Sequence, residues 1–208
     1  LNNPAAGFLG QGSIGGFEGN VTVTHPITGE FLFATDGNVV YKASTGLQAT
    51  GSAVGGNGSS GEAAAVIPDP NGILGRNFLI IGNSASNTTG SIRMAKYDLQ
   101  TNVVSGVTSI LSGGINEALE VIPHTNGTDY WILVSTSDQK VKSYLYSKAS
   151  GFNSTPASST DVPDLAGVSA TAIAQYSFIS WDPRTPGKVL IARHNKVGLA
   201  NFDPSTGA

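Results

Sequence analysis

Four polar residues share one position in a repeated pattern, and their side chains could bind a ligand together. Each stands about six residues before a proline that follows a strand-like run, at Asn20, Glu62, Glu117, and Ser177 or its neighbour Tyr176. If the four runs converge on one channel, two carboxylates, an amide and a hydroxyl form an oxygen-rich ring at its mouth. Such a ring suits Ca²⁺ or the hydroxyls of a sugar. The alternative is that these are solvated polar residues at the starts of strands.

A pair of carboxylates also raises the question of hydrolysis. Glycoside hydrolysis needs two carboxyl groups at a defined separation, one of them protonated by its surroundings. Glu62 and Glu117 could supply such a pair across a channel. The sequence lacks the S-x-D-x-G-x-T-W turn that accompanies sialidase propellers, and it lacks a G-x-S-x-G nucleophile motif. We therefore favour binding over catalysis for these glutamates.

The elements that must position these residues are short strand-like runs, which recur in one order. Each run is rich in Val, Ile, Thr and aromatic residues and is bounded by Gly, Pro, Asn or Asp. One strand ends at a proline turn, an apolar strand follows, and an outer strand closes on a polar turn. Four units repeat this order, at about residues 17–50, 61–105, 116–155 and 172–208, with turn prolines Pro26, Pro68, Pro123 and Pro183.

This repeat predicts an all-β fold, a β-propeller formed by a single domain over residues 1–208. A unit of three or four strands buries little by itself, and radial packing of several units covers their faces. A β-sandwich or another all-β fold is the alternative, but a sandwich has no reason to repeat the turn order. The chain begins with Leu1 rather than Met, as expected of a processed or excerpted chain. We expect the four units to be part of a larger propeller or protein.

Two local patterns give sharper structural expectations. Asp36 and Gly37 form a T-D-G-N segment that is typical of a hairpin turn. Tyr144 and Tyr146 alternate along one run, so they point to the same face of a strand, and we expect them to pack between blades.

Composition excludes several classes of protein. Only 12% of the residues are charged and the net charge is -3, so we expect no nucleic-acid partner. No apolar run is long enough to cross a bilayer as a helix, so we expect no membrane insertion. There are no cysteines, which excludes disulfides and thiolate metal sites but is compatible with export.

Two segments resemble a known family of bacterial proteins. Residues 29–37 (GEFLFATDG) and 123–132 (PHTNGTDYWI) are similar to the propeller-like N-terminal regions of Bacteroidetes cell-surface proteins. Those proteins are exported by the type IX secretion system and often carry gliding-motility or sorting modules. The similarity spans most of Gly19 to Ser147. It implies a secreted, cell-surface location and a role in adhesion or assembly, and it implies no catalytic residues.

Together these observations predict a non-catalytic binding, adhesion or scaffolding module at a bacterial cell surface. The expected partner is a glycan or a surface protein, with secretion or anchoring machinery as a further partner, and Ca²⁺ is the one cofactor that the polar ring would suit. Two alternatives stay open, namely a glycan-active hydrolase that uses Glu62 and Glu117, and a structural subunit of a surface filament or secretion assembly.

Overall fold

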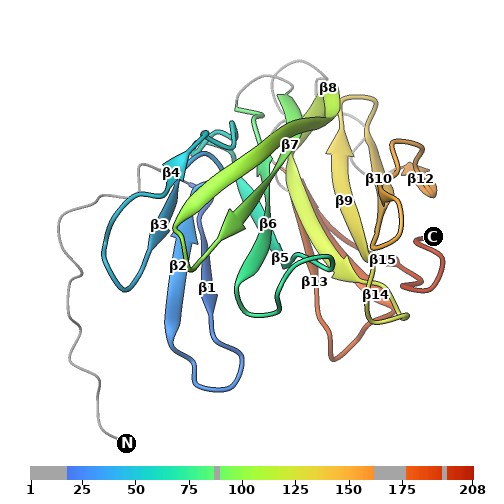
Figure 1. Cartoon of the computed structure of the whole chain (residues 1–208). Coiled ribbons are helices and arrows are strands. Elements are labelled where there is room, and N and C mark those ends of the chain that lie inside the picture. Colours follow the sequence, from blue (N-terminus) through green and yellow to red (C-terminus); the bar gives the residue numbers. More distant parts are fainter. Residues whose placement is uncertain (1–17, 87–89, 162–176, 194–195) are drawn as a thin grey trace, which may run out of the picture.

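The computed structural model describes residues 18–86, 90–161, 177–193 and 196–208 (Figure 1). All regular structure in these ranges is β-strand. Within them, no helix has the length and apolar character of a membrane span.

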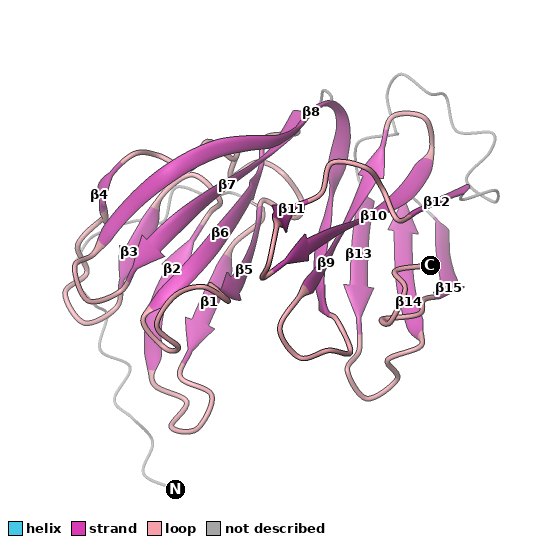
Figure 2. Cartoon of the chain, turned by 45° about the vertical axis from the view of Figure 1, so that its right-hand side comes forward, coloured by secondary structure: helices cyan, strands magenta, loops and turns pink. Residues whose placement is uncertain are grey.

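The strands form four mainly antiparallel blades that stand side by side (Figures 1 and 2). Blade 1 contains β1 (Val21–Thr24), β2 (Phe31–Thr35) and β3 (Val40–Lys42). Blade 2 contains β5 (Ala64–Pro68), β6 (Asn77–Asn83), β7 (Gly90–Asp98) and the first half of β8 (Val103–Pro123), with which the short β4 (Thr50–Gly51) pairs in parallel. Blade 3 contains the second half of β8, β9 (Tyr130–Thr136), β10 (Lys140–Ser147), β11 (Gly151–Phe152) and β12 (Ser158–Asp161). Blade 4 contains β13 (Ser177–Trp181), β14 (Lys188–Arg193) and β15 (Lys196–Asn201).

One long strand, β8, belongs to two blades. It pairs with β7 from Val103 to Ile115, as the outer strand of blade 2, and with β9 from Ile115 to Pro123, as the inner strand of blade 3. Gly113 and Gly114 lie at the crossing with φ of 70° and 67°, a conformation that glycine adopts without strain. The two glycines therefore let one strand leave a sheet and enter the next.

Side chains along a central strand point alternately to its two faces, so the strand presents apolar residues to both neighbouring blades. Phe78 and Ile80 of β6 pack towards blade 1, whereas Leu79 and Ile81 pack towards blade 3. All four are buried, as expected for strands that are covered on both faces. Three apolar clusters therefore join blade 1 to blade 2, blade 2 to blade 3, and blade 3 to blade 4.

Blade 4 is covered on one face only by described residues. Ile179, Val189 and Ile191 pack against blade 3. The opposite face exposes four large apolar side chains, Phe178 (47% exposed), Leu190 (43%), Val197 (68%) and Leu199 (66%). The four blades thus form an open arc, the arrangement of a partial propeller (Figure 2).

The structure confirms the all-β propeller with four blade-like repeats. Asp36 forms the expected turn, since its Oδ1 accepts hydrogen bonds from the N–H groups of Asn38 (2.9 Å) and Val39 (2.7 Å). Tyr144 and Tyr146 are buried between blades 2 and 3, also as expected. The first half of β8 was not anticipated, because its run of Ser, Thr and Gly resembles a loop.

A pair of glycine variants tests the packing of blade 1 on blade 2. Gly37 has φ of 80°, and a Cβ there would lie 2.1 Å from the carbonyl oxygen of Ala63, beside β5. Gly29 has φ of 70° with nothing within 4 Å. We expect Gly29→Ala to cost about 1 kcal/mol from backbone strain alone, and Gly37→Ala to cost about 3 kcal/mol because overpacking adds to that strain. Urea unfolding measures both, and equal losses would contradict the close approach.

Candidate functional site

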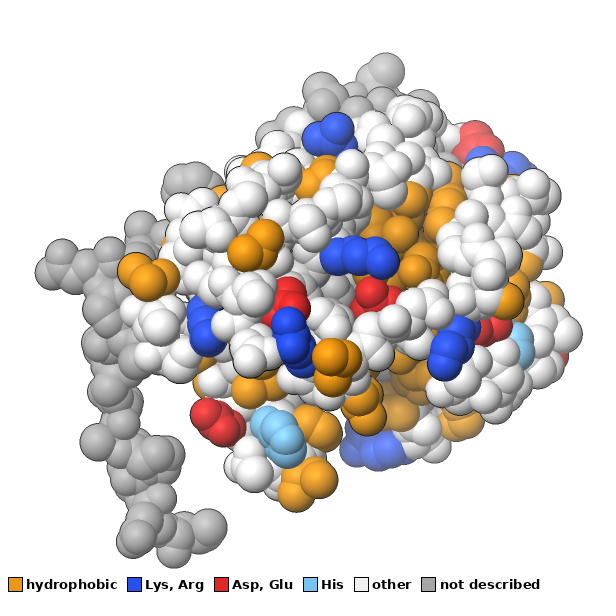
Figure 3. Space-filling model, in the orientation of Figure 1, with side chains coloured by type: hydrophobic (Ala, Val, Ile, Leu, Met, Phe, Trp, Pro, Cys, Tyr) orange, Lys and Arg blue, Asp and Glu red, His pale blue; other side chains and the backbone are white. Residues whose placement is uncertain are grey.

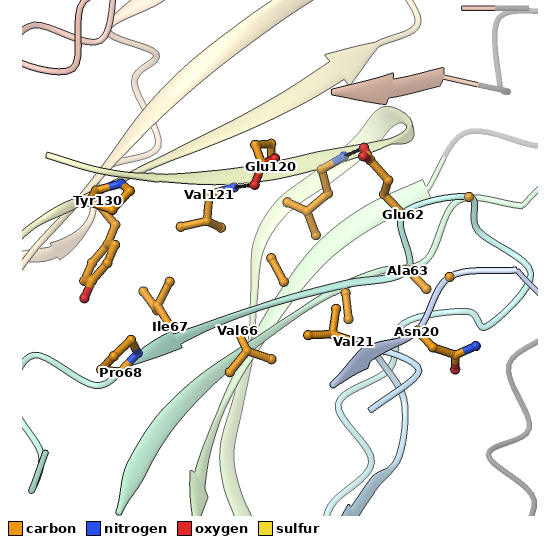
Figure 4. A pocket seen from close by; sticks show the side chains of 16 residues that line it. Asn20, Val21, Glu62, Ala63, Val66, Ile67, Pro68, Glu120, Val121 and Tyr130 are labelled. Carbon is orange, nitrogen blue, oxygen red and sulfur yellow. Dashed lines mark hydrogen bonds between the residues drawn. The ribbon is translucent and has the colours of Figure 1, made fainter. Parts of the chain in front are cut away.

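A groove of about 600 Å³ opens beside the inner strands of blades 1 to 3. Its walls come from the chain around β1, from β5, and from the second half of β8, and Tyr130 of β9 closes one end (Figure 4). We call it the inner-strand groove. Its floor is mainly apolar, and its polar side chains are those of Asn20, Glu62, Glu120 and Tyr130.

Small residues let the inner strands come close enough to form this groove. A Cβ on Gly19 would lie 2.4 Å from the backbone nitrogen of Ala63. A Cβ on Gly61 would lie 2.9 Å from the Phe178 ring and 3.4 Å from Oε2 of Glu117. The G-E-A-A sequence at 61–64 therefore presents one long side chain, that of Glu62, among neighbours too small to block it.

The Glu62 carboxyl joins three inner strands. It leaves the chain just before β5, and its Oε2 accepts hydrogen bonds from the N–H groups of Leu119 in β8 (2.7 Å) and Ile179 in β13 (3.0 Å). Oε1 lies 3.2 Å from the same Ile179 nitrogen. The side chain thus replaces a missing strand partner for β13.

Glu120 acts in the same way two residues further along β13. Its Oε2 accepts a hydrogen bond from the N–H of Trp181 (3.2 Å), and its Oε1 accepts one from its neighbour Val121 (2.8 Å). The two glutamates therefore bind N–H groups of Ile179 and Trp181, which lie in register on one edge of β13. A buried backbone donor without a partner would be costly, so both carboxyls stabilise the fold.

Burial changes the protonation of both groups. It raises the pKa of the Glu62 carboxyl from 4.5 to about 8, although the hydrogen bonds from Ile179 and Leu119 lower the pKa and nearby Glu120 raises it a little further. Burial also raises the pKa of Glu120, against the hydrogen bonds from Val121 and Trp181. At neutral pH Glu62 is therefore mostly protonated.

The structure brings two of the four expected ligand-binding residues to the groove. Asn20 and Glu62 line it. Glu117 is buried, its Oε2 accepts a hydrogen bond from the N–H of Gly61 (3.0 Å), and it does not line the groove. Ser177 is also buried, and its Oγ lies 2.6 Å from Oγ of Ser135.

The four positions therefore do not form one open ring, and the alternative fourth position, Tyr176, lies outside the described residues. Among the residues that are described, no group of three or more His, Cys, Asp or Glu is placed to hold a metal ion. The groove accordingly offers at most two carboxyls to a cation, and the raised pKa of Glu62 opposes cation binding at neutral pH.

Sequence reasoning missed Glu120 and Tyr130 as groove residues. A signal for Glu120 was present, since it is a charged residue inside the apolar run A-L-E-V-I of an inner strand. A charge in such a place is either paired or functional. Tyr130 gave no comparable signal, because aromatic residues are common at strand starts.

Lys and Arg side chains lie apart from one another on the face that Figure 3 shows. They alternate there with neutral and acidic side chains. This face therefore presents no continuous basic stripe.

Comparison with known proteins gives structural similarity only. No protein-family model and no curated protein matches the sequence. The periplasmic gluconolactonase of Pseudomonas aeruginosa aligns over 90% of this chain and 50% of its own, at 17% identity and a TM-score of 0.49. The Dos1 propeller aligns over 89% of this chain and 51% of its own, at 11% identity and a TM-score of 0.40. The chain thus spans about half the length of these two solved chains.

Replacing Glu62 by glutamine tests its protonation. A carboxyl whose pKa is higher in the folded state than in the unfolded state favours folding most strongly below its unfolded pKa of about 4.5. That contribution is lost as the pH rises to about 8. As the pH rises from about 4.5 to about 8, we expect the melting temperature of the native protein to decrease. We expect the melting temperature of Glu62→Gln to decrease by several degrees less over the same range, because glutamine mimics the protonated acid.

The control is Glu30→Gln, which changes an exposed glutamate that does not line the groove. Glu120 titrates with the same sign, so some pH dependence remains in Glu62→Gln. Parallel melting curves for the native protein and Glu62→Gln across this range would show that Glu62 is ionised in the folded state.

Proposed function

We propose that this propeller domain is a non-catalytic binding module whose inner-strand groove holds an uncharged, hydroxyl-rich ligand, such as a glycan. The observation that carries the proposal is the protonated Glu62 beside Glu120 in a groove of about 600 Å³. That volume is within the usual range for a small-ligand site. A protonated carboxyl can donate one hydrogen bond and accept others, which matches a sugar hydroxyl.

The rest of the groove supports the same class of ligand. Asn20 adds an amide at the rim, and Tyr130 adds a phenol. Ala65, Ile67 and Val121 supply an apolar surface between these polar groups. Sugar rings present alternating hydroxyl and C–H surfaces, so a mixed lining of this kind is complementary to them.

Hydrolysis is the second candidate, and one observation favours it. A carboxyl with a pKa near 8 has the property of a general acid. Hydrolysis also requires an ionised carboxylate, and burial raises the pKa of Glu120 as well. Glu117, the partner expected from the sequence, is buried and held by Gly61 outside the groove. The groove therefore supports binding better than turnover.

We further propose that the module works outside the cell, at a bacterial surface, as an adhesion or assembly component. The low fraction of charged residues, 12%, supports this location, and the absence of cysteine is compatible with it. The resemblance of residues 29–37 and 123–132 to cell-surface proteins exported by type IX secretion supports it as well. Under this proposal the partners are surface glycans or surface proteins.

Binding of a panel of neutral oligosaccharides, measured by calorimetry, tests the groove. We expect Glu120→Gln to weaken the best ligand about tenfold, the cost of one hydrogen bond to a carboxyl, while Glu30→Gln binds as the native protein does. We also expect affinity to fall above pH 8, where Glu62 loses its proton.

Failure of the whole panel to bind, or unchanged affinity in Glu120→Gln, would contradict the proposal. Release of reducing sugar by the native protein that is lost in Glu120→Gln would favour hydrolysis instead.

A further inference from the structure

The inner edge of each inner strand carries backbone N–H groups that point away from the rest of the blade. In the second half of β8, the N–H groups of Leu119 and Val121 lie on this edge. They donate to the carboxyls of Glu62 (2.7 Å) and Glu120 (2.8 Å). The next position on the edge is Pro123, which has no N–H group. From Leu119 to Pro123, every inner-edge donor of β8 is therefore bound or absent.

The inner strand of blade 4 follows the same rule. The inner-edge N–H groups of β13 are those of Ile179 and Trp181, and they donate to Glu62 (3.0 Å) and Glu120 (3.2 Å). Pro183 follows two residues after Trp181 and again has no N–H group. The prolines that mark the repeat thus also end the row of inner-edge donors.

Two hydrogen bonds at the ends of β5 define which of its residues face the inner edge. The N–H of Asp69 donates to the carbonyl of Asn77 (2.9 Å), and the N–H of Asn83 donates to the carbonyl of Ala63 (2.8 Å). In an antiparallel pair, residues that bond to the partner strand alternate with residues that point away from it. The odd-numbered residues from 63 to 69 therefore bond to β6, and the even-numbered residues between them point to the inner edge.

β5 differs from β8 and β13 because its inner-edge donors are not bound by a carboxyl. These donors are the N–H groups of Ala64 and Val66, and no described residue accepts a hydrogen bond from either. Pro68 is the next inner-edge position and ends the row. Ala64 and Val66 both line the inner-strand groove, and Ala64 is buried. A buried backbone donor favours any ligand that accepts a hydrogen bond from it.

The inner edge of β5 does not depend on what stands at the two ends of the arc. Blades 1 to 4 stack on one another through apolar clusters between the faces of their sheets. Further blades would stack in the same way on the outer faces of the arc. The inner edge of β5, in the second of the four blades, would still face the groove.

We propose that a glycan of at least two neutral sugar units lies along β5, with its oxygens accepting hydrogen bonds from the N–H groups of Ala64 and Val66. The groove is the one in the proposed function, on which this proposal depends. Two residues apart on a strand correspond to about 6.8 Å. Neighbouring hydroxyls of one sugar ring are much closer together than this, whereas oxygens of two adjacent sugar units span such a distance.

The opposite wall suits a sugar better than a peptide strand. In Figure 4, Val66 and Pro68 lie on one wall of the groove, and Glu120 and Tyr130 lie on the other. The side chains of Glu120 and Tyr130 can bond to hydroxyls that β5 does not reach, because each hydroxyl both donates and accepts. An added peptide strand could use only two donors of β5 before Pro68.

The lining also selects for a ligand without negative charge. None of the described residues that line the groove is a lysine, an arginine or a histidine. An acidic sugar would therefore place its carboxylate beside Glu120 without a cation to compensate. Neutral sugar units avoid this cost.

Amide NMR of the ¹⁵N-labelled full chain tests the contact directly. The probes are the disaccharides cellobiose and maltose, with glucose as the single-unit control. We expect at least one disaccharide to shift the amide signals of Ala64 and Val66 and to slow their hydrogen exchange at least tenfold at saturation. The amide of Ile179, which Glu62 already binds, should change little. Glucose should bind at least tenfold more weakly than that disaccharide.

A proline variant tests the same donor by calorimetry. Val66→Pro removes an N–H group that the ladder between β5 and β6 does not use, and we expect it to weaken the disaccharide at least tenfold. Val197→Pro makes the same replacement on the outer edge of β15, outside the groove, and should bind the disaccharide as the native chain does.

The outcomes separate this proposal from the proposed function. Disaccharide binding that leaves the amides of Ala64 and Val66 unchanged, or that persists in Val66→Pro, would overturn this proposal alone. Glucose binding as tight as that of the disaccharides would also overturn it. If none of the three sugars binds, both proposals are contradicted. If circular dichroism shows that Val66→Pro does not fold, the amide signals of the native chain decide.

Discussion

The relative positions of blades 2, 3 and 4 depend on the hydrogen bonds made by the N–H groups along one edge of β13. A strand edge needs partners for its N–H groups, and here the partners of Ile179 and Trp181 are the carboxyls of Glu62 and Glu120. Glu62 also binds Leu119 of β8, so one side chain fixes blades 2, 3 and 4 relative to each other. Apolar clusters supply most of the stabilising contact between blades, but they are not directional. The carboxyl hydrogen bonds set which backbone atoms face each other.

The same hydrogen bonds explain the protonation of Glu62 in the groove. Its carboxyl must be buried away from water to accept hydrogen bonds from both strands, and burial favours the protonated form. A buried acid that bridges strands is thus also a hydrogen-bond donor in a groove of about 600 Å³. Structural and ligand-binding roles are therefore compatible in one residue, whereas Glu117 and Ser177 are buried and do not line the groove.

The repeat was readable from the sequence because proline fixes where each inner strand ends, and equal spacing from proline placed Asn20 and Glu62 at one groove. The same spacing failed for Glu117 and Ser177, which are buried and do not line the groove, whereas Glu120, nearer to Pro123, does line it. Spacing from proline places a residue along a strand but does not show whether its side chain faces the groove or the core. Nor does it reveal that β8 serves two blades, because this depends on the backbone at Gly113 and Gly114.

The most direct measurement is a ¹³C NMR titration of the Glu62 side-chain carboxyl, assigned by its loss in Glu62→Gln. We predict a midpoint near 8, with the amide proton signals of Leu119 and Ile179 shifting at the same midpoint. A midpoint near 4.5, or amide signals that do not follow it, would show that the carboxyl is solvated and does not hold the inner strands together.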